Sequence, residues 1–163
     1  MNPAPTAPNT HVVLVEPEIH WNAGNAGRTC LAVGAHLHLV GPLGFSLDER
    51  QVRRAGLDYW EHVRPRVWPS FASIEAQLSD LGEPFFFCAQ EGKVLWEVRF
   101  PERVVFLFGR ESVGLAPEIR ARHHGRLVQI PILDERVRSL NLSTSVALAL
   151  YEVLRQRRPS VPR

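Results

Sequence analysis

The chain of 163 residues has few of the features that assign a protein to a special class. It contains only two cysteines, Cys30 and Cys88, which lie far apart in apolar surroundings and match neither a zinc-ligand spacing nor a disulfide framework. The seven histidines show no paired metal-ligand spacing, and the adjacent His123 and His124 would point in different directions on a helix. We therefore expect no metal cofactor.

Long apolar runs and a charge excess are also missing. No apolar run is long enough to cross a bilayer, and the first ten residues, MNPAPTAPNT, lack the charged and apolar regions of a signal peptide. We predict a disordered tail over residues 1–10 and a cytoplasmic location. The net charge is only +2, and Lys93 is the only lysine. Arginine suits phosphate geometry, but a G+C-rich genome would produce the same bias, so the composition alone assigns no partner.

The chain does contain short, continuously apolar runs that alternate with helical segments. With 45% hydrophobic and 22% charged residues it has the composition of a globular protein, and we predict one domain over residues 11–158, followed by a short tail at 159–163. Strands are predicted at 11–15, 36–40, 85–89, 104–108 and 126–130, with a weaker element at 94–100. Helices are predicted at 29–33, 47–55, 71–81, from Pro117 onward and after residue 143. This pattern indicates an α/β fold, a mainly parallel sheet flanked by helices.

Polar loops follow three of the predicted strands, at residues 17–28, 109–115 and 131–143. They should meet at the carboxyl ends of the strands, where open α/β sheets bind ligands. In the first loop, glycines allow a close backbone approach and the helix start suits an anion. The G-x-x-G spacing is neither a dinucleotide fingerprint nor a P-loop. A tight turn that packs the helix on the sheet would explain the glycines, but it explains Asn22, Asn25 and Arg28 less well.

The last helix is apolar on most of its sides and therefore must be covered on most of its sides. Its own sheet and a second copy of the chain would provide that cover, so we expect a homodimer. Four capping residues precede or open the helix, at Asn141, Ser143, Thr144 and Ser145. One residue suffices for a cap. The surplus could present polar groups to a small ligand, although capping and turn formation alone also account for it.

A local basic cluster, Arg50, Arg53 and Arg54, precedes Tyr59 and Trp60. Such a surface can hold a nucleic-acid backbone and stack a base. Considered alone, it is better explained as a solvated helix face followed by a buried aromatic.

Taken together, the three loops resemble the three motifs of the SPOUT RNA methyltransferases of the SpoU/TrmH type. The matching segments are NAGNAGR at 22–28, FGRESVGL at 108–115, and IPI with RSLNLS between 130 and 143. EPEI at 16–19 and RRAGLDY at 53–59 further resemble the minimal TrmL-type branch, which 2′-O-methylates the wobble nucleotide of certain tRNAs. His20 and Trp21 depart from that branch, which often has prolines there. The resemblance covers residues 12–156.

The resemblance implies a SPOUT fold with a C-terminal deep trefoil knot, although knots are rare among folds. It also implies a homodimer, and transfer of a methyl from S-adenosylmethionine to the 2′-hydroxyl of cytidine or uridine at the wobble position, without a metal. Two alternatives stay open: the same chemistry on ribosomal RNA or another tRNA position, and a non-catalytic RNA-binding relative. A redox Rossmann protein is less consistent with the sequence, because the third glycine is missing.

The resemblance also assigns candidate residues. The catalytic candidates are Arg28, supported by Glu111, Asn141, Asn25 and Ser143. The cofactor-binding candidates are Cys88, Gly109, Ile130, Ser139 and Leu140, with Leu115 and Pro131 helping to enclose the ligand. The RNA-binding candidates are Arg53, Arg54, Tyr59 and Tyr151, together with the terminal arginines Arg155, Arg157 and Arg158.

Because arginine keeps its proton, we expect Arg28 to hold the phosphate beside the target ribose and to polarise the hydroxyl. Glu111 would orient Arg28 through a charge-assisted hydrogen bond.

Overall fold

A computed structural model describes residues 9–48, 50 and 58–161 of the chain. The strands are β1 (Thr10–Val15), β2 (His36–Val40), β3 (Arg66–Trp68), β4 (Glu83–Phe87), β5 (Lys93–Val94), β6 (Val104–Phe108) and β7 (Leu127–Gln129). The α-helices are α1 (His20–Val33), α3 (Trp60–Val63), α4 (Phe71–Glu75), α5 (Leu78–Leu81), α6 (Pro117–Arg122) and α7 (Leu142–Arg157). Two 3₁₀ turns are η1 (Leu95–Glu97) and η2 (His124–Arg126).

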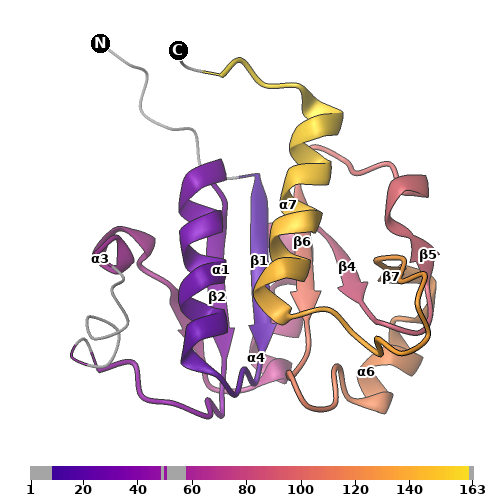
Figure 1. Cartoon of the computed structure of the whole chain (residues 1–163). Coiled ribbons are helices and arrows are strands. Elements are labelled where there is room, and N and C mark those ends of the chain that lie inside the picture. Colours follow the sequence, from indigo (N-terminus) through magenta and orange to yellow (C-terminus); the bar gives the residue numbers. More distant parts are fainter. Residues whose placement is uncertain (1–8, 49, 51–57, 162–163) are drawn as a thin grey trace.

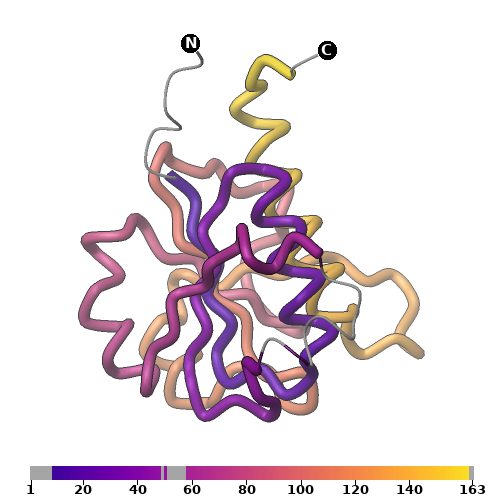
Figure 2. The backbone as a smooth tube through the Cα atoms, turned by 90° about the vertical axis from the view of Figure 1, so that its left-hand side faces the viewer, coloured from indigo at the N-terminus to yellow at the C-terminus, as the bar shows by residue number. Residues whose placement is uncertain are grey.

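The described strands form one seven-stranded sheet in the order β3-β2-β1-β6-β4-β7-β5. Every strand pair in it is parallel. Both faces are covered by helices, as Figures 1 and 2 show: α1 and α7 lie side by side on one face, and α4 and α5 lie on the other. The prediction of an α/β fold with a mainly parallel sheet is confirmed.

Burial on both faces explains why the strands are continuously apolar. Along β1, Val12 and Leu14 pack into the core beneath α1 and α7, whereas Val13 and Val15 pack into the core on the α4 side. Successive side chains of a strand point to opposite faces, so a strand covered on both faces is apolar at most of its positions. Among the helices in the described part of the chain, none is long and apolar enough to cross a membrane.

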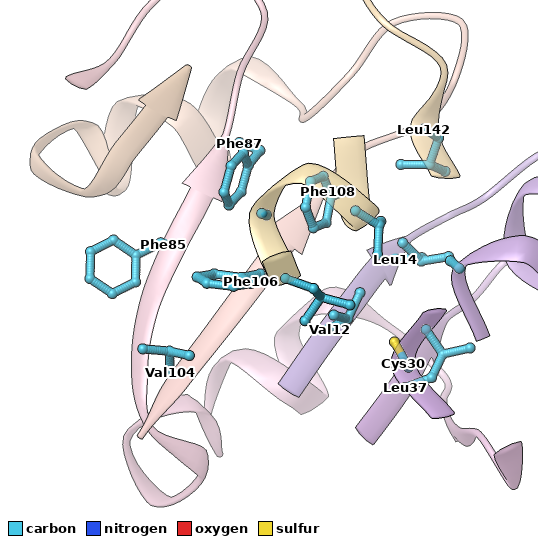
Figure 3. Close-up of a cluster of buried hydrophobic side chains, with 14 of the residues drawn as sticks. Val12, Leu14, Cys30, Leu37, Phe85, Phe87, Val104, Phe106, Phe108 and Leu142 are labelled. Carbon is cyan, nitrogen blue, oxygen red and sulfur yellow. The ribbon is translucent and has the colours of Figure 1, made fainter. Parts of the chain in front are cut away.

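Aromatic rings fill the larger core, which Figure 3 shows around β4 and β6. Phe87 stacks on Phe108 at a centroid distance of 4.5 Å and meets Phe106 edge-on at 5.5 Å. Cys30 of α1 lies in the same core, and burial raises the pKa of its thiol to about 12. This cysteine is therefore a packing residue.

The predicted elements and the structure differ at several places. β1, β2 and β6 agree with the predicted strands to within one residue, but β3 was missed and residues 94–100 contain the end of β5 followed by η1. The helix predicted at 71–81 is divided into α4 and α5, because Gln77 leaves helical geometry and donates to Ile74 at i−3 instead of i−4. Most of the helix predicted at 47–55 lies outside the described residues.

The first polar loop was predicted wrongly as a turn over residues 22–28. Helix α1 begins at His20, so these residues are helical. Gly27 nevertheless permits a close approach: a Cβ there would lie 2.9 Å from Cζ3 of Trp60 and 3.1 Å from Cγ1 of Val63. The missing side chain therefore allows α3 to pack directly on α1.

A buried polar network joins β1, β2 and β3. His38 is 1% exposed, and its Nδ1 accepts a 3.0 Å hydrogen bond from the indole Nε1–H of Trp68. Because the indole nitrogen can only donate, Nδ1 carries no proton and Nε2–H donates to Nδ1 of His11 at 3.0 Å. Burial lowers the pKa of His38 to about 3, and neighbouring positive charges act in the same direction: His11, His36 and Arg66. His38 is therefore held neutral.

Candidate active site

Three loops that are far apart in the sequence meet at one pocket at the carboxyl ends of the central strands. The pocket has a volume of about 520 Å³ and is lined by residues that follow β4, β6 and β7, and by the start of α1 and of α7. Six of the seven predicted cofactor-binding residues line it: Cys88, Gly109, Leu115, Ile130, Ser139 and Leu140. Pro131 is not among the lining residues. Glu111 and Asn141 also line the pocket, so it contains candidates of both kinds.

Glu18 of the first loop and Glu111 of the second loop each accept hydrogen bonds from the other loop. The carboxylate of Glu111 accepts hydrogen bonds from the backbone N–H groups of Glu18 and Ile19, at 2.7 and 3.1 Å. The carboxylate of Glu18 in turn accepts from the backbone N–H and the hydroxyl of Ser112, both at 2.9 Å, and from Arg110 at 3.0 Å. The Ser112 bonds, with those of Arg110, lower the pKa of Glu18 below its usual value. The Glu18 carboxylate is thus stabilised in its ionised form.

The anion expected at the start of the first helix is therefore a side chain of the protein itself. The residue before α1, Ile19, has no capping side chain, and Glu111 accepts from the backbone N–H groups of Ile19 and Glu18, immediately before the first helical turn. A negative charge at this end of α1 is also favoured by the helix dipole.

Asn22 connects this arrangement to the third loop. Its Nδ2 donates to Glu111 at 3.1 Å, and its Oδ1 accepts from Nδ2 of Asn141 at 2.9 Å. Asn141 caps α7, because its Oδ1 accepts from the backbone N–H of Thr144 at 3.2 Å and from the hydroxyl of Ser143 at 2.7 Å. A continuous hydrogen-bond chain thus joins all three loops around the pocket. Asn22 is 6% exposed, so these amide bonds are shielded from water.

Arg28 lies elsewhere on α1, exposed, with its guanidinium carbon 5.2 Å from the centroid of the Tyr59 ring. The hydrogen bond expected between Arg28 and Glu111 is not formed, because Glu111 binds the N-terminus of α1 and Asn22 instead. Asn25 is exposed on α1, and the pocket lining includes neither Asn25, Arg28 nor Ser143. A substrate that reached both the pocket and Arg28 would have to lie along α1.

The pocket fits a cofactor such as S-adenosylmethionine in size and in chemistry. Its volume is within the range of small-molecule sites, about 300–1,000 Å³. The walls combine apolar side chains, such as Phe87, Leu115 and Ile130, with the backbone of glycine-containing loops. A Cβ at Gly109 would lie 2.1 Å from the backbone of Gly114 and Leu115, so the second loop can close on itself only with glycine at that position.

The predicted RNA-binding residues have different surroundings. Arg53 and Arg54 lie outside the described residues. Tyr151 is exposed on α7, as is Leu148. The terminal arginines are largely occupied: Arg155 pairs with Glu152, and Arg157 bonds to Thr10 and to the carbonyl groups of Pro101 and Glu102. Arg158 ends α7 in a left-handed conformation.

Residues 9–151 match the SpoU rRNA Methylase family. The chain belongs to this family. A tRNA (cytidine(34)-2′-O)-methyltransferase of Burkholderia pseudomallei is 43% identical over 150 residues, which cover 90% of this chain and 94% of the relative. The recognised resemblance to the SpoU type of RNA methyltransferases is thereby confirmed.

Solved structures agree with this assignment. One described as "Structural insights into the 2-OH methylation of C/U34 on tRNA" is 46% identical, with a TM-score of 0.84, and covers 91% of this chain and 96% of that chain. An AdoMet-bound rRNA methyltransferase from Sinorhizobium meliloti is 25% identical, with a TM-score of 0.79, over 93% of this chain and 57% of that one. The α/β architecture is therefore shared with family members that act on different RNAs.

Sequence reasoning missed Asn22 and Glu18 as site residues. Asn22 belongs to the first motif, and a tight turn explains it poorly; this was the signal in the sequence that Asn22 could be a site residue. Glu18 gave no local signal, because its partners Arg110 and Ser112 are more than ninety residues away.

Proposed function

We propose that this protein transfers a methyl group from S-adenosylmethionine to the ribose 2′-hydroxyl of the wobble nucleotide, cytidine or uridine, of a tRNA. The observation that carries the proposal is the convergence of the three motif loops on one pocket, in a chain 43% identical to an enzyme named for this reaction. Since tRNA is the proposed substrate, we place the enzyme in the cytoplasm.

The roles of the residues follow from the geometry. S-adenosylmethionine, when bound, supplies a methyl group that its sulfonium has already activated. The loops at Gly109, Ile130 and Leu140 would hold this cofactor largely through backbone groups. The hydrogen bonds from Glu111 through Asn22 to Asn141 would fix the positions of those loops relative to one another, so that the hydroxyl can be brought in line with the methyl. Arg28 would grip the phosphate next to the target ribose, and the hydroxyl proton would leave to that phosphate or to water.

We further propose a homodimer formed through the layer of α1 and α7. These helices lie side by side and expose large apolar side chains that the chain itself leaves uncovered: Trp21, Leu31, Leu148 and Tyr151. Light scattering of Leu148→Arg should show a smaller mass than the wild type, whereas Trp96→Arg, an exposed aromatic of η1, should not change the mass. The deep trefoil knot is also part of the proposal and rests on the family resemblance.

The first experiment incubates the purified protein with labelled S-adenosylmethionine and unmodified tRNA, then maps the label by nuclease digestion and mass spectrometry. We expect a 2′-O-methyl group on the first anticodon nucleotide. Label elsewhere in tRNA would keep the chemistry and reject the wobble position.

Ribosomal RNA is the second candidate substrate, because one structural relative is an rRNA methyltransferase. Cofactor binding with label only on ribosomal RNA would favour it. A protein that binds RNA but no cofactor would be a non-catalytic relative.

A further inference from the structure

Arg28 makes a cation–π contact with Tyr59 and does not pair with Glu111, the carboxylate with which it was expected to pair. Its guanidinium carbon lies 5.2 Å from the centroid of the Tyr59 ring, within the range of such a contact. Glu111, the partner expected from the sequence, is instead hydrogen-bonded to the start of α1. The position of Arg28 therefore depends on an aromatic ring.

The ring is held in place by the packing of α3 on α1. Tyr59 directly precedes α3, and the backbone N–H of His62 donates to its carbonyl at 2.9 Å. Trp60 and Val63 lie against the bare Cα of Gly27, the residue before Arg28. A Cβ at position 27 would force the side chains of Trp60 and Val63 to shift. The position of Tyr59 is thus set by the packing of α3 on α1 next to the arginine.

Stacking and ion pairing differ in what they leave for the substrate. An ion pair with a carboxylate would consume the N–H donors of the guanidinium along its edge. Arg28 instead lies over the Tyr59 ring and forms no ion pair with a carboxylate of the described residues, so N–H donors of its guanidinium remain for phosphate oxygens. The ring also restricts a long, exposed side chain that would otherwise sample many rotamers, so less entropy is lost when the phosphate binds.

We propose that Tyr59 is a positioning residue that preorganises Arg28 for the phosphate beside the methylated ribose, instead of stacking a base of the RNA. This inference rests on the proposed methyl transfer and specifies how its key cation is oriented. It replaces the RNA-binding role that the sequence suggested for Tyr59.

The test compares Tyr59→Leu, which removes the ring, with Tyr59→Phe, which keeps it, using the full-length protein and unmodified tRNA. For Tyr59→Leu we expect kcat to fall about two- to five-fold, the range of a cation–π contact at an exposed site, with an unchanged Kd for S-adenosylmethionine. Tyr59→Phe should restore kcat to near the wild-type value. Trp96→Leu, on η1 near the opposite edge of the sheet, is the matched control and should leave kcat unchanged.

A double-mutant cycle separates positioning from base stacking. If Tyr59 acts through Arg28, then Tyr59→Leu will not weaken tRNA binding further in the Arg28→Ala background. Additive losses in tRNA binding, or an unchanged kcat for Tyr59→Leu, would overturn the inference. Equal losses for Leu and Phe would overturn it too, because they would assign the effect to the hydroxyl.

Misfolding of a variant and failure of methyl transfer are each controlled for. Thermal unfolding of each variant checks the fold, and Tyr59→Met replaces Tyr59→Leu if the latter does not fold. The binding cycle needs no turnover, so it tests Tyr59 even if the wild type fails to methylate tRNA, an outcome that would reject the proposed function alone.

Discussion

Acid should destabilise this protein through one buried histidine, His38, because its neutral form is built into the sheet. Nδ1 of His38 accepts a hydrogen bond from the indole N–H of Trp68 and therefore cannot carry a proton in the folded state. The pKa of His38 is lowered from 6.5 to about 3. When the chain unfolds, the imidazole regains its ordinary pKa and binds a proton below that pH.

The sign and size of the effect follow from this difference. The stabilisation is fully present above pH 6.5 and is lost as the pH falls toward 3, because over that window only the unfolded state takes up the proton. Each pH unit in the window costs about 1.4 kcal/mol. Between pH 7.5 and pH 4.5 the free energy of unfolding should therefore fall by roughly 3 kcal/mol on account of His38 alone.

The assay is urea unfolding of the wild type and of His38→Asn at both pH values. Asn offers Oδ1 as an acceptor for the indole but cannot titrate. At pH 7.5 the variant should be less stable by about 1–3 kcal/mol, through lost packing and a weakened hydrogen bond. At pH 4.5 that deficit should shrink by roughly 3 kcal/mol, or reverse in sign.

The control is Leu37→Ala, a buried neighbour on β2 that carries no titratable group and should cost the same at both pH values. Titrating groups remote from His38 cancel in the difference between variant and wild type, whereas His11 and His36 interact with it directly. If the deficit of His38→Asn is equal at pH 7.5 and pH 4.5, the histidine is not held neutral and the reasoning fails.

Three further predictions concern the site. Arg28→Ala should lower methyl transfer by about 100-fold or more while calorimetry finds cofactor binding within about two-fold of the wild type; lost cofactor binding would contradict the assigned role. Glu111→Gln should speed hydrogen exchange of the amides at the start of α1 about ten-fold or more, because a charged acceptor is lost, and Glu118→Gln, exposed on α6, should leave those amides unchanged. Asn141→Ala should lower the free energy of unfolding by about 1 kcal/mol through the lost cap, and a silent thermal melt would show that the cap contributes nothing.

The strands were predictable because their signal is local. A strand buried on both faces is apolar at most of its positions, and β1, β2 and β6 fit that pattern, although β2 also includes His36 and His38. β3 was missed because it has only three residues, and two of them, Arg66 and Val67, are exposed at the sheet edge. A short edge strand has no pattern that distinguishes it from a loop.

The start of α1 could not be predicted from nearby residues, because its cap comes from Glu111, ninety-two residues away from Ile19. For the same reason the pairing of Arg28 was predicted wrongly. It depends on how closely α3 approaches Gly27, which is a matter of tertiary packing. The residues that line the pocket were predicted more completely than the pairing of Arg28, because the motif loops that contain them each follow a recognisable strand.

Under the proposed function, the two cysteines would make the protein its own reporter of cofactor occupancy. Cys30 is buried, with a thiol pKa of about 12, so it will resist alkylation in the native state. Cys88 is half-buried and lines the pocket. A thiol reagent should therefore modify Cys88 first, and a bound cofactor should slow that modification. Mass spectrometry of the alkylated protein would then measure cofactor affinity without RNA, turnover or an introduced label.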